Sequence, residues 1–304
     1  MAHTLGTWLL GLWQAIRVWA SRAYYRFSNA LAWRGHTHPG PCSDLHIPVG
    51  GAAIRARLYS NALGATRPLI VYIHGGGWVI GDLETHHPFC QVLSQSSGCS
   101  VIALDYRRAP EHTFPAAQDD CLAAIRWIAQ HAAELGTNDN RLVIAGDSAG
   151  GNLATCACLE IDPASRKKIS GQVLIYPATD HYSAGFASYT ERATGQTLTA
   201  AIVQWFWDTY LGGLDAQAPE VQRAFPLRSS LLASLPPPTL LVTAEQDPLR
   251  DEGKAYAEKL RLAGVPVSSH HFANAAHGFA CSEGPHADFR DFINQLTTWL
   301  AQLD

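Results

Sequence analysis

Short apolar runs recur along the chain from residue 68 onward and are separated by longer segments of mixed polarity. Runs of this length are typical of strands buried on both faces, as in a parallel sheet. The predicted strands lie at 68–73, 100–106, 142–145, 171–177, 238–246 and 267–272. Upstream, Leu45–Val49 and Ile54–Tyr59 flank Gly50-Gly51 and predict a β-hairpin.

The longer segments between these runs predict helices. They cover 117–133, a stretch from Asn152 onward, 253–263 and 285–303. Strands that alternate with helices form βαβ units, whose strands pair in parallel. The sequence therefore predicts an α/β protein with a mostly parallel central sheet flanked by helices.

Two segments break this alternation and predict a helical cap above the strand ends. Residues 1–33 place Trp and Leu side chains at spacings of three and four, which indicates an amphipathic helix. This helix could pack on the protein's own surface, or it could lie on a membrane or a lipid-like substrate. The second segment has a predicted helix at 199–211 with dense aromatic residues, while 36–41 is rich in breakers and predicts a linker.

These elements predict one catalytic domain with a cap. We expect an N-terminal cap element at 1–45 and a first part of the core at 46–179. Inserted cap helices follow at 180–225, and 226–304 completes the core.

The composition of the chain mainly excludes certain partners and sites. Hydrophobic residues make up 47% and charged residues 16%, which suits a globular protein, and a net charge of −4 without runs of one sign indicates no nucleic-acid partner. Seven scattered cysteines lack zinc-site spacing and favour free thiols in a reducing cytoplasm. The N-terminal segment has no basic start, and its arginines interrupt it, so neither a signal peptide nor stable membrane insertion is expected.

The strongest candidate for chemistry is Ser148, which follows a predicted strand, precedes a predicted helix, and has glycines two residues before and after it. A nucleophile on such a sharp turn projects its hydroxyl away from the sheet, and glycine lets the neighbouring backbones pass closely. The alternative is an ordinary Gly/Ser-rich turn that starts a helix.

A second glycine-rich loop, His74-Gly75-Gly76-Gly77-Trp78, follows another predicted strand. Its backbone N–H groups could approach a carbonyl oxygen because no side chains intervene. The alternatives are a flexible loop or a phosphate-binding loop, and the latter is disfavoured because no G-K-[ST] follows. His74 itself suits a role in holding the loop by hydrogen bonds.

Downstream strands supply an acid and a base in the order that follows such a serine in α/β hydrolases. Asp247 lies just past the strand that begins at residue 238, and His277 lies in the loop after the last strand. Asp251 falls within the next helix, whereas His270 and His271 fall within the strand itself. In addition, Asp105 and Glu111 are interpreted as structural residues that brace loops near Ser148.

Four motifs together resemble those of the hormone-sensitive-lipase-like carboxylesterases, which are bacterial esterases of the α/β-hydrolase superfamily: HGGGW at 74–78, GDSAGGN at 146–152, DPLRDEG at 247–253 and HGF at 277–279. The similarity spans roughly residues 68–281. The chain differs from the common family pattern in having Arg108 in place of leucine and His87 in place of aspartate.

This resemblance implies an α/β-hydrolase fold with about eight strands and a helical cap. It further implies that Ser148 is the nucleophile, His277 the base and Asp247 the acid that orients it, with no metal or organic cofactor. The implied oxyanion hole consists of N–H groups of Gly76, Gly77 and Ala149.

The expected activity is hydrolysis of small, uncharged esters with short to medium acyl chains. One alternative is an amide, peptide or specialised deacetylase-type hydrolase with the same triad. Another is a non-catalytic small-molecule receptor like the plant gibberellin receptor, which resembles this family but lacks a functional triad histidine; His277 disfavours it here. Edge-strand dimers occur among similar proteins, so a homodimer is an open option.

Overall fold

The computed structural model describes residues 2–36, 40–137, 141–194, 197–230 and 236–303, with the side chains of the first helix from residue 11 onward. Residues 37–39 of the predicted linker lie outside this range.

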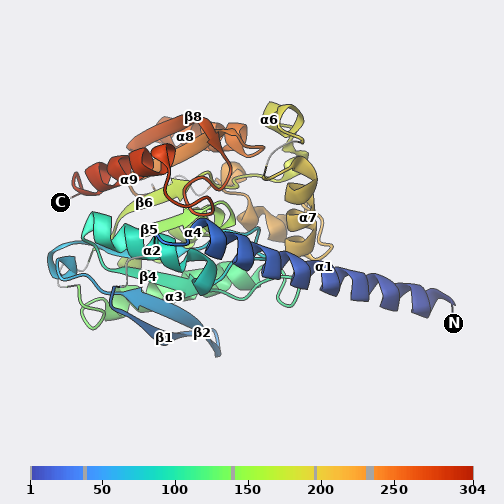
Figure 1. The fold of residues 1–304 in the computed structure, drawn as a ribbon, viewed down its shortest axis with the longest axis horizontal. Coiled ribbons are helices and arrows are strands. Elements are labelled where there is room, and N and C mark those ends of the chain that lie inside the picture. Colours follow the sequence, from blue (N-terminus) through green and yellow to red (C-terminus); the bar gives the residue numbers. More distant parts are fainter. Residues whose placement is uncertain (1, 37–39, 138–140, 195–196, 231–235, 304) are drawn as a thin grey trace.

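An eight-stranded sheet forms the centre of the molecule, in the order β1-β2-β4-β3-β5-β6-β7-β8 (Figure 1). The β1–β2 hairpin joins β4 antiparallel, and all further neighbours pair in parallel. The strands are β1 (Cys42–Val49), β2 (Ala52–Tyr59), β3 (Leu69–Ile73), β4 (Val101–Asp105), β5 (Leu142–Asp147), β6 (Ile169–Ile175), β7 (Thr239–Gln246) and β8 (Val267–Ala276). The predicted mostly parallel sheet of about eight strands is thus confirmed.

Helices cover both faces of this sheet. The larger ones are α1 (Ala2–Ala32), α2 (Leu83–Ser97), α3 (Ala116–His131), α4 (Ala149–Glu160), α7 (Ala200–Leu211), α8 (Arg250–Leu262) and α9 (Ala287–Leu300). Shorter helical pieces are η1 (Gly64–Thr66), α5 (Pro163–Arg166), η2 (Tyr182–Ala184), α6 (Ala187–Glu191), η3 (Pro219–Ala224) and η4 (Pro226–Arg228).

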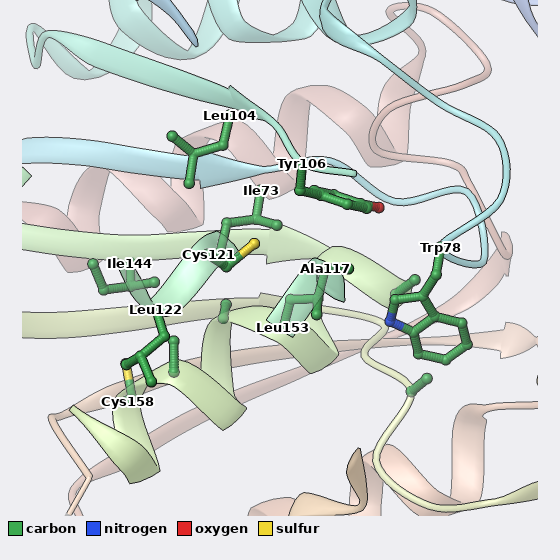
Figure 2. Close-up of a cluster of buried hydrophobic side chains, with 14 of the residues drawn as sticks. Ile73, Trp78, Leu104, Tyr106, Ala117, Cys121, Leu122, Ile144, Leu153 and Cys158 are labelled. Carbon is green, nitrogen blue, oxygen red and sulfur yellow. The ribbon is translucent and has the colours of Figure 1, made fainter. Parts of the chain in front are cut away.

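Successive side chains of β3 enter two separate hydrophobic cores because side chains alternate across a strand. Val71 and Ile73 belong to the core shared with α3, α4 and α8, part of which is shown in Figure 2. Ile70 and Tyr72 belong to the other core, shared with α2 and α9. Packing from both sides holds the strand ends in place, and the strand ends in turn hold the start of each following loop.

Helix α2 was missed in the sequence analysis. Its apolar positions are interrupted by His86, His87 and Pro88, so they form no continuous stripe. Its start is nevertheless specified locally, because Asp82 accepts hydrogen bonds from backbone N–H groups of the first turn in a capping box with Thr85. A left-handed Gly98 ends the helix.

Several predicted boundaries were wrong by a few residues. Helix α4 starts at Ala149, directly after the serine, and α8 starts at Arg250, earlier than the predicted 152 and 253. Strand β8 continues to Ala276, beyond the predicted residue 272. A tight turn places α4 and α8 sooner than the apolar pattern shows, whereas β8 is longer because it keeps pairing with β7 as far as Gln246 and Ala276.

Helix α1 runs across the molecule and extends beyond it toward the N-terminus (Figure 1). Apart from Val18, which joins one of the hydrophobic cores, its inward contacts are mainly polar. Arg22 donates to the carbonyl oxygen of Val79 at 2.8 Å and forms a paired salt bridge with Glu111, while Arg26 bonds Asp82 at 2.7 Å. The helix therefore does pack on the protein's own surface, but through hydrogen bonds and ion pairs over its C-terminal half.

Helix α7, predicted at 199–211, lies over the glycine-rich loop that follows β3. The ring of Trp78 stacks on Tyr210 at 4.5 Å and contacts Trp207 at 4.2 Å between ring centroids. Trp207 and Tyr210 are completely buried, so these aromatic residues serve packing.

Candidate active site

Ser148 occupies a strained turn between β5 and α4. Its backbone has φ 55° and ψ −120°, a region that costs most non-glycine residues on the order of 1–3 kcal/mol. Glycine is required on either side. A Cβ at Gly150 would collide with the carbonyl oxygens of Ile73 and His74, and one at Gly146 would collide with the carbonyl of Gly150. The turn thus has the geometry predicted for a nucleophile elbow.

The structure brings Ser148, His277 and Asp247 together although 129 and 30 residues separate the bonded pairs. His277 Nε2 lies 3.0 Å from Ser148 Oγ, and its Nδ1 lies 2.8 Å from Asp247 Oδ2. Asp247 is fully buried, and its other oxygen accepts the N–H of Leu249 at 2.8 Å. This chain of contacts orients the imidazole so that Nε2 can accept the serine proton.

The competing residues lie elsewhere. Asp251, within α8, accepts the N–H of Ser188 and the guanidinium of Arg250. His270 lies within β8, and His271 bonds Glu245 at 3.0 Å. None of them contacts Ser148 or His277 through a hydrogen bond in the described chain.

His74 holds its loop from inside the protein. Its Nδ1 lies 2.8 Å from the carbonyl oxygen of Gly75, and its ring stacks on Tyr106 at 4.3 Å. Burial, together with the nearby His86 and Arg108, lowers the pKa of His74 to about 3. A neutral, fully enclosed imidazole agrees with the predicted structural role.

Asp147 links the glycine-rich loop to the elbow, a role that the sequence analysis did not assign. Its Oδ1 accepts hydrogen bonds from Tyr72 Oη at 2.6 Å and from the N–H of Gly75 at 2.8 Å. Burial alone would raise the pKa of Asp147, but His86, 3.4 Å away, and these donors lower it instead. The position of Asp147 inside GDSAG was a usable signal, whereas nothing in the sequence singled out His86.

The residues interpreted as braces do connect loops. Glu111 ties α1 to the loop after β4 through Arg22, and Asp105 lies 3.9 Å from both Arg55 and Arg108. Burial raises the pKa of Asp105. Arg108, one of the departures from the family pattern, donates to the carbonyl oxygen of Gly81 and so supports the same region.

Two cavities meet at Ser148. A small one of about 20 Å³ is lined by Ala149, Val203 and Phe206, among others. A larger one of about 470 Å³ is lined by His277, Gly76 and residues of α1. Gly77 borders both cavities, so the predicted oxyanion-hole residues face the space beside the serine hydroxyl.

One group within the described residues could present three metal ligands: His86, Asp147 and Cys281, whose candidate atoms all lie within 4.8 Å of one another. Asp147 already accepts hydrogen bonds from Tyr72 and Gly75. Tyr72 Oη also lies 3.3 Å from Cys281 Sγ. The group therefore forms a buried hydrogen-bond network behind the elbow.

A second buried carboxyl group anchors the chain where it leaves β6. Glu252 Oε1 accepts the N–H groups of Thr179 at 2.6 Å and Asp180 at 3.3 Å, and Oε2 accepts Tyr189 Oη at 2.8 Å. Thr179 precedes the insertion, Asp180 is its first residue, and Tyr189 belongs to α6 within it. Burial is the main cause that raises the pKa of Glu252 from 4.5 to about 8.

Replacing Glu252 with glutamine is expected to flatten the dependence of stability on pH. Because the folded state raises this pKa, the contribution of Glu252 is fully present below its unfolded pKa and is lost as pH rises through about 8. Glutamine cannot ionise, yet its amide can donate to Tyr189 and accept from Thr179. Urea unfolding at about pH 5 and about pH 9 measures the change.

Glu258→Gln is the matched control, because this side chain lies on the same helix but is 61% exposed. The control should keep the wild-type pH dependence. Equal loss of stability with pH in wild type and Glu252→Gln would contradict the expectation.

These features together define the class of α/β hydrolases. They are a parallel sheet, a serine on a strand-to-helix turn with a glycine-rich loop beside it, and an acid and a histidine on later loops. Comparison with known proteins agrees. The chain belongs to the α/β-hydrolase fold family, whose model matches residues 70–281.

Two of the similar proteins are named as ester hydrolases. The chain is 39% identical over 251 residues to the carboxylic ester hydrolase LipN of Mycobacterium tuberculosis, a match that spans 79% of this chain and 66% of that protein. It is 36% identical to the ethyl acetate hydrolase of Pseudomonas putida, over 85% of this chain and 82% of that protein. The resemblance to hormone-sensitive-lipase-like carboxylesterases is thereby confirmed.

Solved structures give the same result. The crystal structure of EstE1, a thermostable carboxylesterase cloned from a metagenomic library, superposes with a TM-score of 0.87 at 36% identity. The match covers 94% of this chain and 97% of EstE1. Within the described residues, we find no helix long and apolar enough to span a membrane.

Proposed function

We propose that the protein is a serine carboxylesterase that hydrolyses small, uncharged esters with short to medium acyl chains. The observation that carries this proposal is the position of His277, which bonds Ser148 with Nε2 and Asp247 with Nδ1. Such an arrangement makes an otherwise weak hydroxyl nucleophile reactive, because the base is already placed to take its proton.

In the proposed mechanism, Ser148 Oγ attacks the ester carbonyl carbon while His277 Nε2 takes the hydroxyl proton. Backbone N–H groups of the glycine-rich loop and of α4 hold the oxyanion. The same imidazole then protonates the departing alkoxide as the C–O bond breaks. Water then attacks the carbonyl carbon of the acyl-serine while its proton passes to His277. As the bond between this carbon and Ser148 Oγ breaks and the acid leaves, His277 returns the proton to Oγ.

The oxyanion donors proposed are those implied by the resemblance: N–H groups of Gly76, Gly77 and Ala149. The left-handed φ of +104° at Gly76 and +58° at Gly77 supports this assignment, because backbone amides in such a turn can point to the same side. Loss of one donor of this kind costs on the order of 10² to 10³ in rate.

The two cavities divide the substrate between them. The leaving alcohol must lie on the side of His277, which protonates it, so the alcohol occupies the cavity of about 470 Å³. The acyl chain then points into the cavity of about 20 Å³, whose wall includes Phe206, a residue that borders both cavities. This division favours short acyl groups and tolerates bulky alcohols. We propose that α1 and the insertion around α7 are the cap that shapes both spaces.

A nitrophenyl-ester chain-length series tests this proposal against matched anilides. The esters should be hydrolysed far faster than the anilides, with acetyl and propionyl groups preferred. Faster anilide turnover would favour the amide or peptide hydrolase instead, and tight ligand binding with no turnover would favour a receptor.

Replacing Phe206 with alanine is expected to shift acyl preference toward longer chains. Removing the ring enlarges the small cavity, and one methylene more or less in such a pocket alters kcat/KM by roughly 10- to 200-fold. The measured quantity is the ratio of kcat/KM for octanoyl to that for acetyl esters. Trp205→Ala is the matched control, because Trp205 lines the larger of the two cavities at Ser148 but not the small one, and should leave that ratio unchanged.

Six of the seven cysteines are buried, and burial raises the thiol pKa of Cys90, Cys121 and Cys156. Thiols of this kind are inert and suit a reducing compartment. This pattern supports the proposed cytoplasmic location.

A further inference from the structure

Helix α1 turns a broad apolar face to solvent. Six large side chains of this face are between 45% and 72% exposed: Leu12, Trp13, Ile16, Trp19, Tyr24 and Phe27. Single exposed hydrophobic residues are ordinary, but a contiguous group of this size marks an interaction surface.

The helical period gathers these residues on one side. They fall within about 140° of the helix circumference and extend along about 22 Å of its axis. From Val18 onward the opposite side faces the protein, where Val18 and Asn29 are buried and Arg22 forms its hydrogen bonds. Residues 11–17 are exposed all round the helix, which extends beyond the rest of the molecule there (Figure 1). Helix α1 is therefore amphipathic in the reverse sense to an ordinary surface helix, whose apolar stripe faces the core.

We propose that this face of α1 docks the protein onto an anionic phospholipid bilayer, lying in the interface without crossing it. Trp and Tyr side chains combine an apolar ring with a polar group and favour the boundary between headgroups and acyl chains. The apolar face is too wide for the contact between two helices of a coiled coil, which buries a narrow row of aliphatic side chains. A flat lipid surface fits a broad aromatic face better than a second copy of the helix does.

The charge of the segment favours anionic lipid. The first 43 residues contain four arginines and no aspartate or glutamate, although the whole chain has a net charge of −4. Arg22 and Arg26 form ion pairs with Glu111 and Asp82, so Arg17 and Arg34 are the arginines left for a lipid surface. Arg17 lies at one flank of the face, with its guanidinium 4.3 Å from the centre of the Trp205 ring, and Arg34 is exposed just beyond the end of the helix. Within the described residues, no carboxylate pairs with either of them. Basic groups beside an apolar helix face attract acidic headgroups within a Debye length.

The docking face adjoins the mouth of the larger cavity. Tyr24 belongs to the exposed face and also lines this cavity, together with Arg17, Ser21 and Ser28 on the flank of the same helix. Docking through α1 would therefore place the entrance of the alcohol side at the lipid–water boundary. The surface stands independently of the proposed function, because none of its contacts involves Ser148.

Co-sedimentation of the full chain with vesicles tests this proposal. Wild type is expected to bind vesicles of phosphatidylcholine mixed with phosphatidylglycerol and to bind phosphatidylcholine alone more weakly. A variant that combines Trp13→Ser, Trp19→Ser and Phe27→Ser should bind the mixed vesicles at least about tenfold more weakly. Leu262→Ser is the matched control: Leu262 is 81% exposed on α8, and its loss should leave vesicle binding unchanged.

Hydrolysis of a water-soluble acetate ester reports the integrity of the fold in every variant and should be the same as in wild type. The proposal is overturned if wild type stays unbound, if the triple variant binds as wild type does, or if the two vesicle types bind equally. It is also overturned if sedimentation velocity shows a dimer that the triple substitution dissociates, because the face would then serve a second copy. Absence of ester hydrolysis with intact vesicle binding would refute the proposed function alone.

Discussion

Replacing Ser148 with alanine is expected to abolish ester hydrolysis, with kcat lowered by about 10⁴ to 10⁶. The hydroxyl is the group that His277 reaches at 3.0 Å, and the remaining backbone donors can only stabilise attack by water. Substrate binding should persist, because the cavities keep their walls. Steady-state kinetics with a short-chain nitrophenyl ester measures the loss.

Labelling with an organophosphonate provides a second readout at the same residue. Wild type should take up one equivalent, and Ser148→Ala none. Turnover that survives in a folded Ser148→Ala variant would exclude the proposed nucleophile. Circular dichroism distinguishes this outcome from unfolding, and alanine removes the side-chain oxygen without adding volume to the strained turn.

Replacing Asp247 with asparagine is expected to lower kcat by about 10⁴ while KM changes little. An amide in this position would donate to Nδ1, which reverses the tautomer and leaves Nε2 unable to accept the serine proton. Asp247 is fully buried and 2.8 Å from Nδ1, so no water can readily replace its charge. Rates across pH measure the effect.

Asp251→Asn is the decisive control, because Asp251 lies four residues further on and is the other acid of the DPLRDEG motif. Its carboxylate bonds Ser188 and Arg250, so its loss should alter stability modestly and kcat by less than about tenfold. The assignment would be reversed if Asp251→Asn were the inactive variant.

Much of this site could be predicted from sequence because its residues follow buried strands. The carboxyl ends of β5 and β7 and the loop after β8 come to one edge of the sheet, so a serine, an acid and a histidine after those strands must be near one another. Apolar runs mark such strands clearly. The glycines around Ser148 also identify the tight turn from sequence, because close backbone contacts exclude any other residue there.

The parts that escaped prediction depend on contacts between distant segments. Helix α2 has no clear apolar stripe; its capping box and its packing against β4, α9, α1 and β2 hold it in place. The role of Asp147 depends on Tyr72 and on the N–H of Gly75, which are far away in sequence. The outward apolar face of α1 could not be assigned either, since the helical pattern is the same whichever side meets the core.

The contact between α7 and the glycine-rich loop has a kinetic consequence. The ring of Phe206 fills the space that a Cβ at Gly77 would occupy, so the helix and the proposed oxyanion loop are packed as one unit. A long acyl chain could enter the small cavity only by displacing that ring, which would also release the loop that has to hold the oxyanion. Poor substrates would then bind normally and react slowly, so that discrimination against long acyl chains is expressed in kcat and only weakly in KM.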